Sequence, residues 1–195
     1  MTSSKQQKLI VNTPTRTGST FLCNSITNFL DIDDSLIYKT HDPALLRKSL
    51  DMQIMILRNP VDSIASMVAM DKRNGSNNID VDISDRISHF NEMLDAFCIS
   101  YNKTVPFLFD QVINNTKEVV DIISKEFSIN YRNIPLNNAV TDRHNFVKTS
   151  KTLDFYDHIF NKLGEHGDEL SSLDTKYNRS VMHLQFRQKQ LKFII

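Results

Sequence analysis

The segment TPTRTGST at 13–20 carries residue types that bind a phosphate group. It follows the short apolar run KLIVN at 8–12 and precedes an apolar spacing typical of a helix. Backbone N–H groups at a helix start converge on an anion, and the hydroxyls of Ser19 and Thr20 can donate to it as well. The sequence therefore predicts a phosphate-binding loop with Arg16 as its cation. A polar turn with a capping serine is the alternative interpretation.

This segment differs from the phosphate-binding loop of nucleotide triphosphatases. That loop has the pattern GxxxxGK followed by serine or threonine. Here the first glycine is absent, and the cation Arg16 precedes Gly18 instead of following a glycine. The sequence therefore argues against an ATPase.

The segment YKTHDP at 38–43 places Lys39 and His41 two residues apart at the end of a second apolar run. In a strand, that spacing aims both side chains at the same face. The carboxyl ends of parallel strands line the ligand crevice of α/β folds, which makes His41 a candidate catalytic residue. A histidine with a purely structural role is the alternative.

The segment RNPVDSIAS at 58–66 forms a third polar group after an apolar run. Arg58 offers a rigid fork for phosphate oxygens, and Ser66 falls in the helix that follows. Asn59 can cap that helix, with Pro60 at its first position. The alternative is a surface arginine and a packed serine.

The order of apolar runs and helical patterns predicts a single α/β domain over 1–195. We expect three layers, a central parallel sheet flanked by helices, with the phosphate loop after the first strand. The expected strands lie at 8–12, 35–40, 53–58 and 105–109, with helices near 60–70, 83–101 and 115–127. We also expect an N-terminal tail at 1–7, a mobile surface loop at 74–82 and a helical C-terminal segment at 168–195.

Composition narrows the possible partners. The chain has 23 Lys and Arg against 23 Asp and Glu, so no overall charge attracts nucleic acid or an anionic membrane. Its longest apolar run, at 54–57, is far shorter than the roughly 20 residues that a membrane span needs, and residues 1–13 lack the apolar core of a signal peptide. Cys23 and Cys98 lie among apolar residues and are interpreted as reduced thiols. We expect a soluble cytoplasmic protein without a metal, since its histidines lack the spacing of metal ligands.

Together, the three polar segments resemble the sulfotransferases that use 3′-phosphoadenosine 5′-phosphosulfate (PAPS), and the chain looks like a short member of that family. The family has a 5′-phosphosulfate loop similar to TPTRTGSTF, a Lys-Thr-His-x-Pro segment similar to KTHDP, and a 3′-phosphate segment, Arg-Asn-x-x-Asp…Ser, similar to RNPVDSIAS. Weaker matches are FDQVINNT at 109–116 and FVKTSKTLDFYDH at 146–158. The resemblance covers most of residues 8–158.

The resemblance implies transfer of a sulfuryl group from PAPS to a hydroxyl or amine of a small-molecule, sugar or peptide acceptor, with the 3′,5′-bisphosphate (PAP) as the other product. His41 would be the general base, assisted by Lys39 and Arg16. Phe21 would stack on the adenine ring, unless it is simply a buried helix residue. The residues implied to bind PAPS are Arg16, Thr17, Gly18, Ser19, Thr20, Phe21, Arg58, Ser66 and Lys148.

The chain departs from the family pattern at several positions. Arg16 stands where many members have lysine, and it can stabilise charge but hardly donate a proton. Phe109 stands where tyrosine is usual, and Ser150 replaces a glycine near Lys148. Two other functions stay open: a small-molecule or nucleotide kinase with Asp110 as a magnesium ligand, and a nucleotide-binding module without catalysis.

Overall fold

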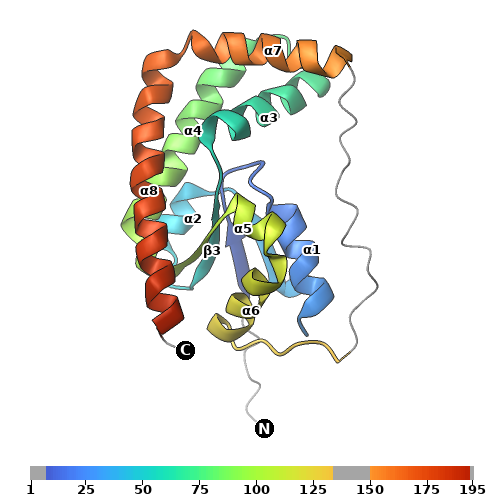
Figure 1. The fold of residues 1–195 in the computed structure, drawn as a ribbon, viewed down its shortest axis with the longest axis vertical. Helices are drawn as coiled ribbons and strands as arrows, with labels where there is room; N and C mark the ends of the chain where they lie inside the picture. The colour runs from blue at the N-terminus through green and yellow to red at the C-terminus, as the bar shows by residue number, and fades with distance from the viewer. Residues whose placement is uncertain (1–7, 134–149, 194–195) are drawn as a thin grey trace.

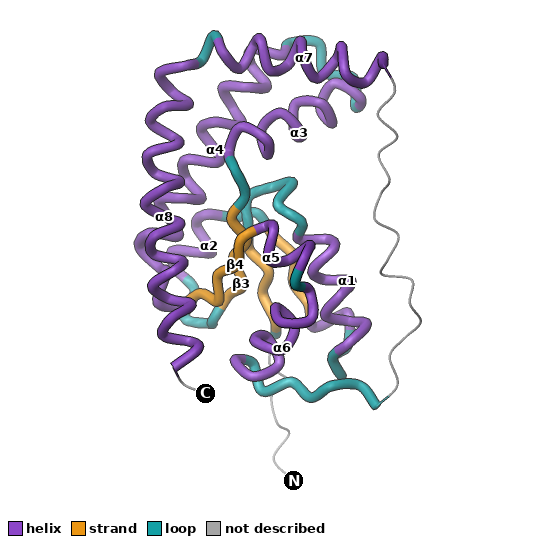
Figure 2. The backbone as a smooth tube through the Cα atoms, in the orientation of Figure 1, coloured by secondary structure: helices purple, strands orange, loops and turns teal. Residues whose placement is uncertain are grey.

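The computed structural model describes residues 8–133 and 150–193 and has the predicted α/β fold. In this part of the chain, four parallel strands form one sheet in the order β2-β1-β3-β4. The strands are β1 (Leu9–Asn12), β2 (Ile37–Thr40), β3 (Gln53–Leu57) and β4 (Thr104–Leu108). Figure 2 shows the sheet in the centre with helices on both sides.

Alternation along β3 divides the core between the two faces of the sheet. Ile54 and Ile56 belong to one hydrophobic cluster, and Met55 and Leu57 belong to the other. The first cluster is covered by α1 (Ser19–Phe29), α5 (Phe109–Asn114) and α6 (Thr116–Glu126). The second is covered by α2 (Pro43–Lys48), α3 (Pro60–Arg73), α4 (Ile79–Ser100), α7 (Ser150–Gly164) and α8 (Gly167–Phe193). The predicted arrangement of helices on both sides of a parallel sheet is thus confirmed (Figure 1).

Helix starts follow the local sequence closely. The Asn59 side chain accepts hydrogen bonds from the N–H groups of Val61 (2.9 Å) and Asp62 (3.3 Å), with Pro60 at the first helical position. Asp42 caps α2 by accepting from the Ala44 N–H at 2.8 Å. Both caps lie next to strand ends, so they fix where the chain leaves the sheet.

The prediction of a mobile loop over 74–82 is wrong about where the loop ends. Residues 79–82 form the first turn of α4, whose N-cap is Asn78. Within the remaining connection, the Ser76 hydroxyl donates to Asp82 at 2.6 Å and the Ser76 N–H donates to the Asp71 carbonyl at 3.0 Å. The polar composition of this stretch therefore comes from helix capping and not from a long loop.

Smaller differences concern the ends of elements. β2 begins at Ile37 after a short 3-10 turn over Asp34–Leu36, and Phe109 opens α5 instead of ending β4. The helix expected at 168–195 corresponds to α8, which runs beside α4 (Figure 1), while residues 194–195 lie outside the described residues.

The two cysteines and the hydropathy of the helices agree with the sequence analysis. Cys23 and Cys98 are both free and half-buried. Burial raises the pKa of the Cys23 thiol to about 11, so this thiol stays protonated at neutral pH. Among the described residues, no helix is long and apolar enough to cross a membrane.

Candidate anion-binding site

The predicted phosphate loop follows β1 at the carboxyl edge of the sheet. The Thr13 N–H donates to the Thr40 carbonyl at 3.3 Å, which holds the loop beside the end of β2. Arg16 and Gly18 then adopt left-handed conformations, with φ of 61° and 89°. These two residues turn the chain sharply, so that α1 begins at Ser19 with its N-terminus facing the strand ends.

Two threonine side chains of the loop point inward. The buried Thr17 hydroxyl donates to the Pro14 carbonyl at 2.7 Å and lies 2.8 Å from the Thr13 hydroxyl. Thr17 is one of the residues implied to bind PAPS, and in the structure its side chain is occupied by contacts within the loop. Only the Thr17 backbone is left for a ligand, because its hydroxyl stabilises the loop.

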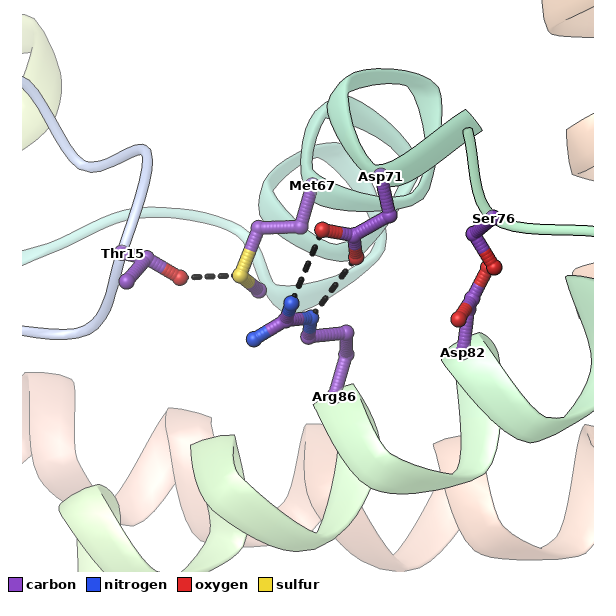
Figure 3. Close-up of polar contacts among 6 residues, drawn as sticks. All are labelled: Thr15, Met67, Asp71, Ser76, Asp82 and Arg86. Atoms are coloured by element: carbon purple, nitrogen blue, oxygen red, sulfur yellow. Dashed lines mark hydrogen bonds and ion pairs between the residues drawn. The ribbon is translucent and has the colours of Figure 1, made fainter. Parts of the chain in front are cut away.

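The loop also contacts α3. The Thr15 hydroxyl points at the sulfur of Met67 and is hydrogen-bonded to it (Figure 3). One turn further along α3, Asp71 forms a two-pronged ion pair with Arg86 of α4, with both N–O distances at 2.9 Å. Helix α4 thus supports the helix against which the loop rests.

Three cations from separate segments meet at the loop. The Arg16 Nε donates to the Ser66 hydroxyl at 3.1 Å, and Arg58 Nη1 donates to the Arg16 carbonyl at 3.0 Å. Lys39 Nζ donates to the Thr20 hydroxyl at 3.0 Å. The structure therefore brings together all five of these residues, which the sequence analysis had taken from three different segments.

Within the described part of the chain, these three cations have no carboxylate within ion-pair distance. The described residues contain five ion pairs within 4.0 Å, and none of them includes Arg16, Lys39 or Arg58. Arg16 and Lys39 are exposed and Arg58 is half-buried. Uncompensated cations beside a helix N-terminus give a positive local field, and such a field attracts a polyanion even when the net charge of the chain is zero.

His41 lies beside the first residue of the loop. Its Nδ1 atom is 2.6 Å from the Thr13 carbonyl oxygen, which can only accept a hydrogen bond. In the neutral imidazole, Nδ1 therefore carries the proton and Nε2 has a free lone pair. This tautomer is the one that a general base acting through Nε2 requires.

A second histidine, His89 of α4, lies near His41. Burial holds the pKa of His89 below its ordinary value. Glu92 acts in the opposite direction, while positive charge on His41 or Arg86 lowers the pKa of His89 further. His89 cannot be recognised from the sequence, because its position on α4 gives no sign that it approaches the end of β2.

Phe109 is a second residue of the site whose role is not visible in the sequence. The Arg58 guanidinium carbon lies 4.5 Å from the centre of the Phe109 ring. On the loop side, a Cβ placed on Gly18 would come within 3.2 Å of the Cδ2 and Cε2 atoms of this ring. Phe109 therefore touches both the loop and the predicted 3′-phosphate arginine.

Three other residues, Phe21, Lys148 and Asp110, also have a predicted role. Phe21 is half-buried and packs against the hydrophobic cluster under α1, which favours its alternative interpretation as a packing residue. Lys148 lies outside the described residues. Asp110 is exposed; burial raises the pKa of Tyr177 on α8, and the charge of Asp110 raises it further. The described residues contain no group of three or more His, Cys, Asp or Glu side chains that could hold a metal ion.

The fold and the site define an α/β protein with a cation-rich site at the carboxyl edge of a parallel sheet. No protein-family model, curated protein or solved structure matches this chain. What points to a function is therefore the site itself, together with the sequence segments that form it.

Proposed function

We propose that this chain is a sulfotransferase that moves a sulfuryl group from PAPS to a hydroxyl or amine acceptor. The observation that carries the proposal is the meeting of Arg16, Lys39 and Arg58 at one loop without a carboxylate partner among the described residues. PAPS is a polyanion with phosphate groups at two ends of its ribose. Three cations beside a helix N-terminus suit such a ligand, and the segments that supply them are the ones that resemble the PAPS-dependent family.

The loop and two of the cations are assigned to the 5′ end of the nucleotide. PAPS supplies an activated sulfuryl group: its bond to the phosphate oxygen breaks as a bond to the acceptor oxygen or nitrogen forms. Negative charge then grows on the 5′-phosphate, as it does on the leaving group in phosphoryl transfer. The N–H groups of residues 18–20, the Ser19 and Thr20 hydroxyls, Arg16 and Lys39 stabilise that charge most strongly where it develops.

His41 is assigned to the acceptor. With Nδ1 bound to the Thr13 carbonyl, Nε2 is free to take the proton that the attacking hydroxyl or amine loses. General-base assistance of this kind contributes roughly 10²–10⁴ in rate. The backbone contact also fixes the plane of the ring, so the base is oriented before the acceptor arrives.

Arg58 and Ser66 are assigned to the 3′-phosphate. Ser66 accepts a hydrogen bond from Arg16 Nε, which leaves the Ser66 hydroxyl proton available for a phosphate oxygen. Arg58 uses Nη1 on the Arg16 carbonyl and has further N–H groups to offer. Lys148 is proposed as an additional contact. Arg58 and Ser66 thereby distinguish PAPS from ATP, which has no 3′-phosphate.

Thermal-shift titration tests the class of nucleotide. We expect PAP to raise the melting temperature and ATP with Mg²⁺ to leave it unchanged. A shift with ATP and Mg²⁺ alone would favour a kinase. A shift with PAP but no transfer to any acceptor would favour a nucleotide-binding module without catalysis.

A further inference from the structure

Two neighbouring strands bring Arg58 and Phe109 together. Leu57 of β3 and Leu108 of β4 are register partners in the parallel sheet. Arg58 directly follows Leu57, and Phe109 directly follows Leu108. The two residues therefore lie side by side at the carboxyl ends of their strands. The guanidinium carbon of Arg58 lies 4.5 Å from the ring centre, a distance typical of a cation–π contact.

The ring itself is held in place from other directions. Phe109 opens α5 and packs against the hydrophobic cluster on the α1 side of the sheet. Its Cδ2 and Cε2 edge lies so close to Gly18 that a Cβ there would approach to 3.2 Å. The ring is therefore fixed against the core and the loop, and Arg58 rests on it.

Arg58 is restrained at two points as a result. Its guanidinium carbon lies over the Phe109 ring, and its Nη1 donates to the Arg16 carbonyl at 3.0 Å. A free arginine side chain loses much conformational freedom when it grips a phosphate, and holding it beforehand reduces that loss. Phenylalanine has no hydroxyl of its own to offer a ligand, so its contribution here is the face of its ring.

We propose that Phe109 is a positioning residue that holds the Arg58 guanidinium ready for the 3′-phosphate. As far as the nucleotide is concerned, this inference rests on the proposed function. It assigns the selectivity for a 3′-phosphate to three side chains, Arg58, Ser66 and Phe109. The first two would contact the phosphate, and the third acts through Arg58.

Calorimetric titration of four variants tests the role of the ring. We expect Phe109→Leu to weaken PAP binding about three- to tenfold and to leave 5′-AMP binding within about twofold. Phe109→Tyr keeps the aromatic face and should bind PAP within about twofold of the unchanged protein. In an Arg58→Ala background, adding Phe109→Leu should cause no further loss, because the residue that the ring positions is gone.

Two results would overturn the inference. Equal losses for PAP and 5′-AMP in Phe109→Leu would mean that the ring supports the loop or contacts the nucleoside, and a full extra loss in the Arg58→Ala background would mean that the two residues act independently. Thermal unfolding of each variant checks that it is folded.

A second measurement does not depend on the nucleotide. In the protein without ligand, the ring should shift the NMR signal of the Arg58 Nε–H upfield, an effect kept in Phe109→Tyr and lost in Phe109→Leu. If the unchanged protein does not bind PAP but this shift is seen, the proposed function fails while the positioning of Arg58 stands. If the signal is the same in all three proteins, the positioning of Arg58 by Phe109 is wrong, whatever PAP does.

Discussion

His41 and Thr13 are joined by a hydrogen bond of 2.6 Å between the imidazole Nδ1 and the backbone carbonyl oxygen. This contact links the segment after β2 to the first residue of the loop after β1. It also leaves Nε2 as the basic nitrogen of the neutral ring. His41 and the loop after β1 are therefore joined directly.

Replacement of His41 should separate binding from transfer. We expect His41→Ala to keep PAP affinity within about threefold, because the ring faces the acceptor, and to lower turnover by about 10² or more. Steady-state rates with an alkyl alcohol and with a phenol measure the effect. The phenol loses its proton more easily, so it should partly restore turnover in His41→Ala but not in Lys39→Ala.

A matched control for this experiment is His158, an exposed histidine on α7. His158→Ala should leave both rates unchanged. Near-normal turnover of His41→Ala on the alkyl alcohol would remove the general-base role and leave His41 as a residue that ties β2 to the loop.

Arg58 should decide selectivity for the 3′-phosphate. Arg58→Ala removes a charge-assisted contact of roughly 1.5–3 kcal/mol, so PAP affinity should fall at least about tenfold while 5′-AMP affinity barely changes. Ser66→Ala should show the same selectivity with a smaller effect. Arg47 on the surface of α2 supplies the control, and Arg47→Ala should change neither affinity. Equal losses for PAP and 5′-AMP would place Arg58 outside the 3′-phosphate site.

Gly18 should tolerate alanine poorly for two separate reasons. Its φ of 89° costs a residue with a Cβ about 1–2 kcal/mol, and the new methyl group would also meet the Phe109 ring at 3.2 Å. Gly75 has a φ of 98°, but a Cβ added there would meet nothing within 4 Å, so Gly75→Ala isolates the conformational cost. Urea unfolding should show a larger loss of stability for Gly18→Ala. Equal losses for the two variants would argue against the close contact between Gly18 and Phe109.

His89 should make the fold sensitive to acid. Burial lowers its pKa below the ordinary value of 6.5 that it regains on unfolding, so the unfolded chain binds more protons between these two values. The stability that the neutral ring contributes is present above about pH 6.5 and is lost as the pH falls further. Unfolding free energies measured between about pH 7.5 and 5 should fall less steeply in His89→Gln. Identical slopes in the two proteins would contradict this.

The sequence predicts the strands and helices that form this site better than it predicts the contacts between their side chains. The strand, loop and helix around residues 8–30 follow from apolar spacing, and the start of α3 follows from Asn59 and Pro60. The inward turn of the Thr17 hydroxyl is not predictable, because several hydroxyls in TPTRTGST are chemically alike and only the folded loop selects one. The contact between Arg58 and Phe109 depends on β4 lying beside β3, and strand order is not visible in a linear pattern.

Sulfuryl transfer from PAPS at the cation-rich loop can be tested by measuring the transfer itself. The purified protein would be incubated with PAPS labelled in the sulfuryl group and an extract of the source cells, and the labelled products would be separated and counted. We expect a labelled acceptor product from the unchanged protein and about 10²-fold less from His41→Ala at equal PAPS occupancy. No labelled product from a protein that binds PAP would contradict sulfuryl transfer, and equal product from the two proteins would contradict His41 as its general base.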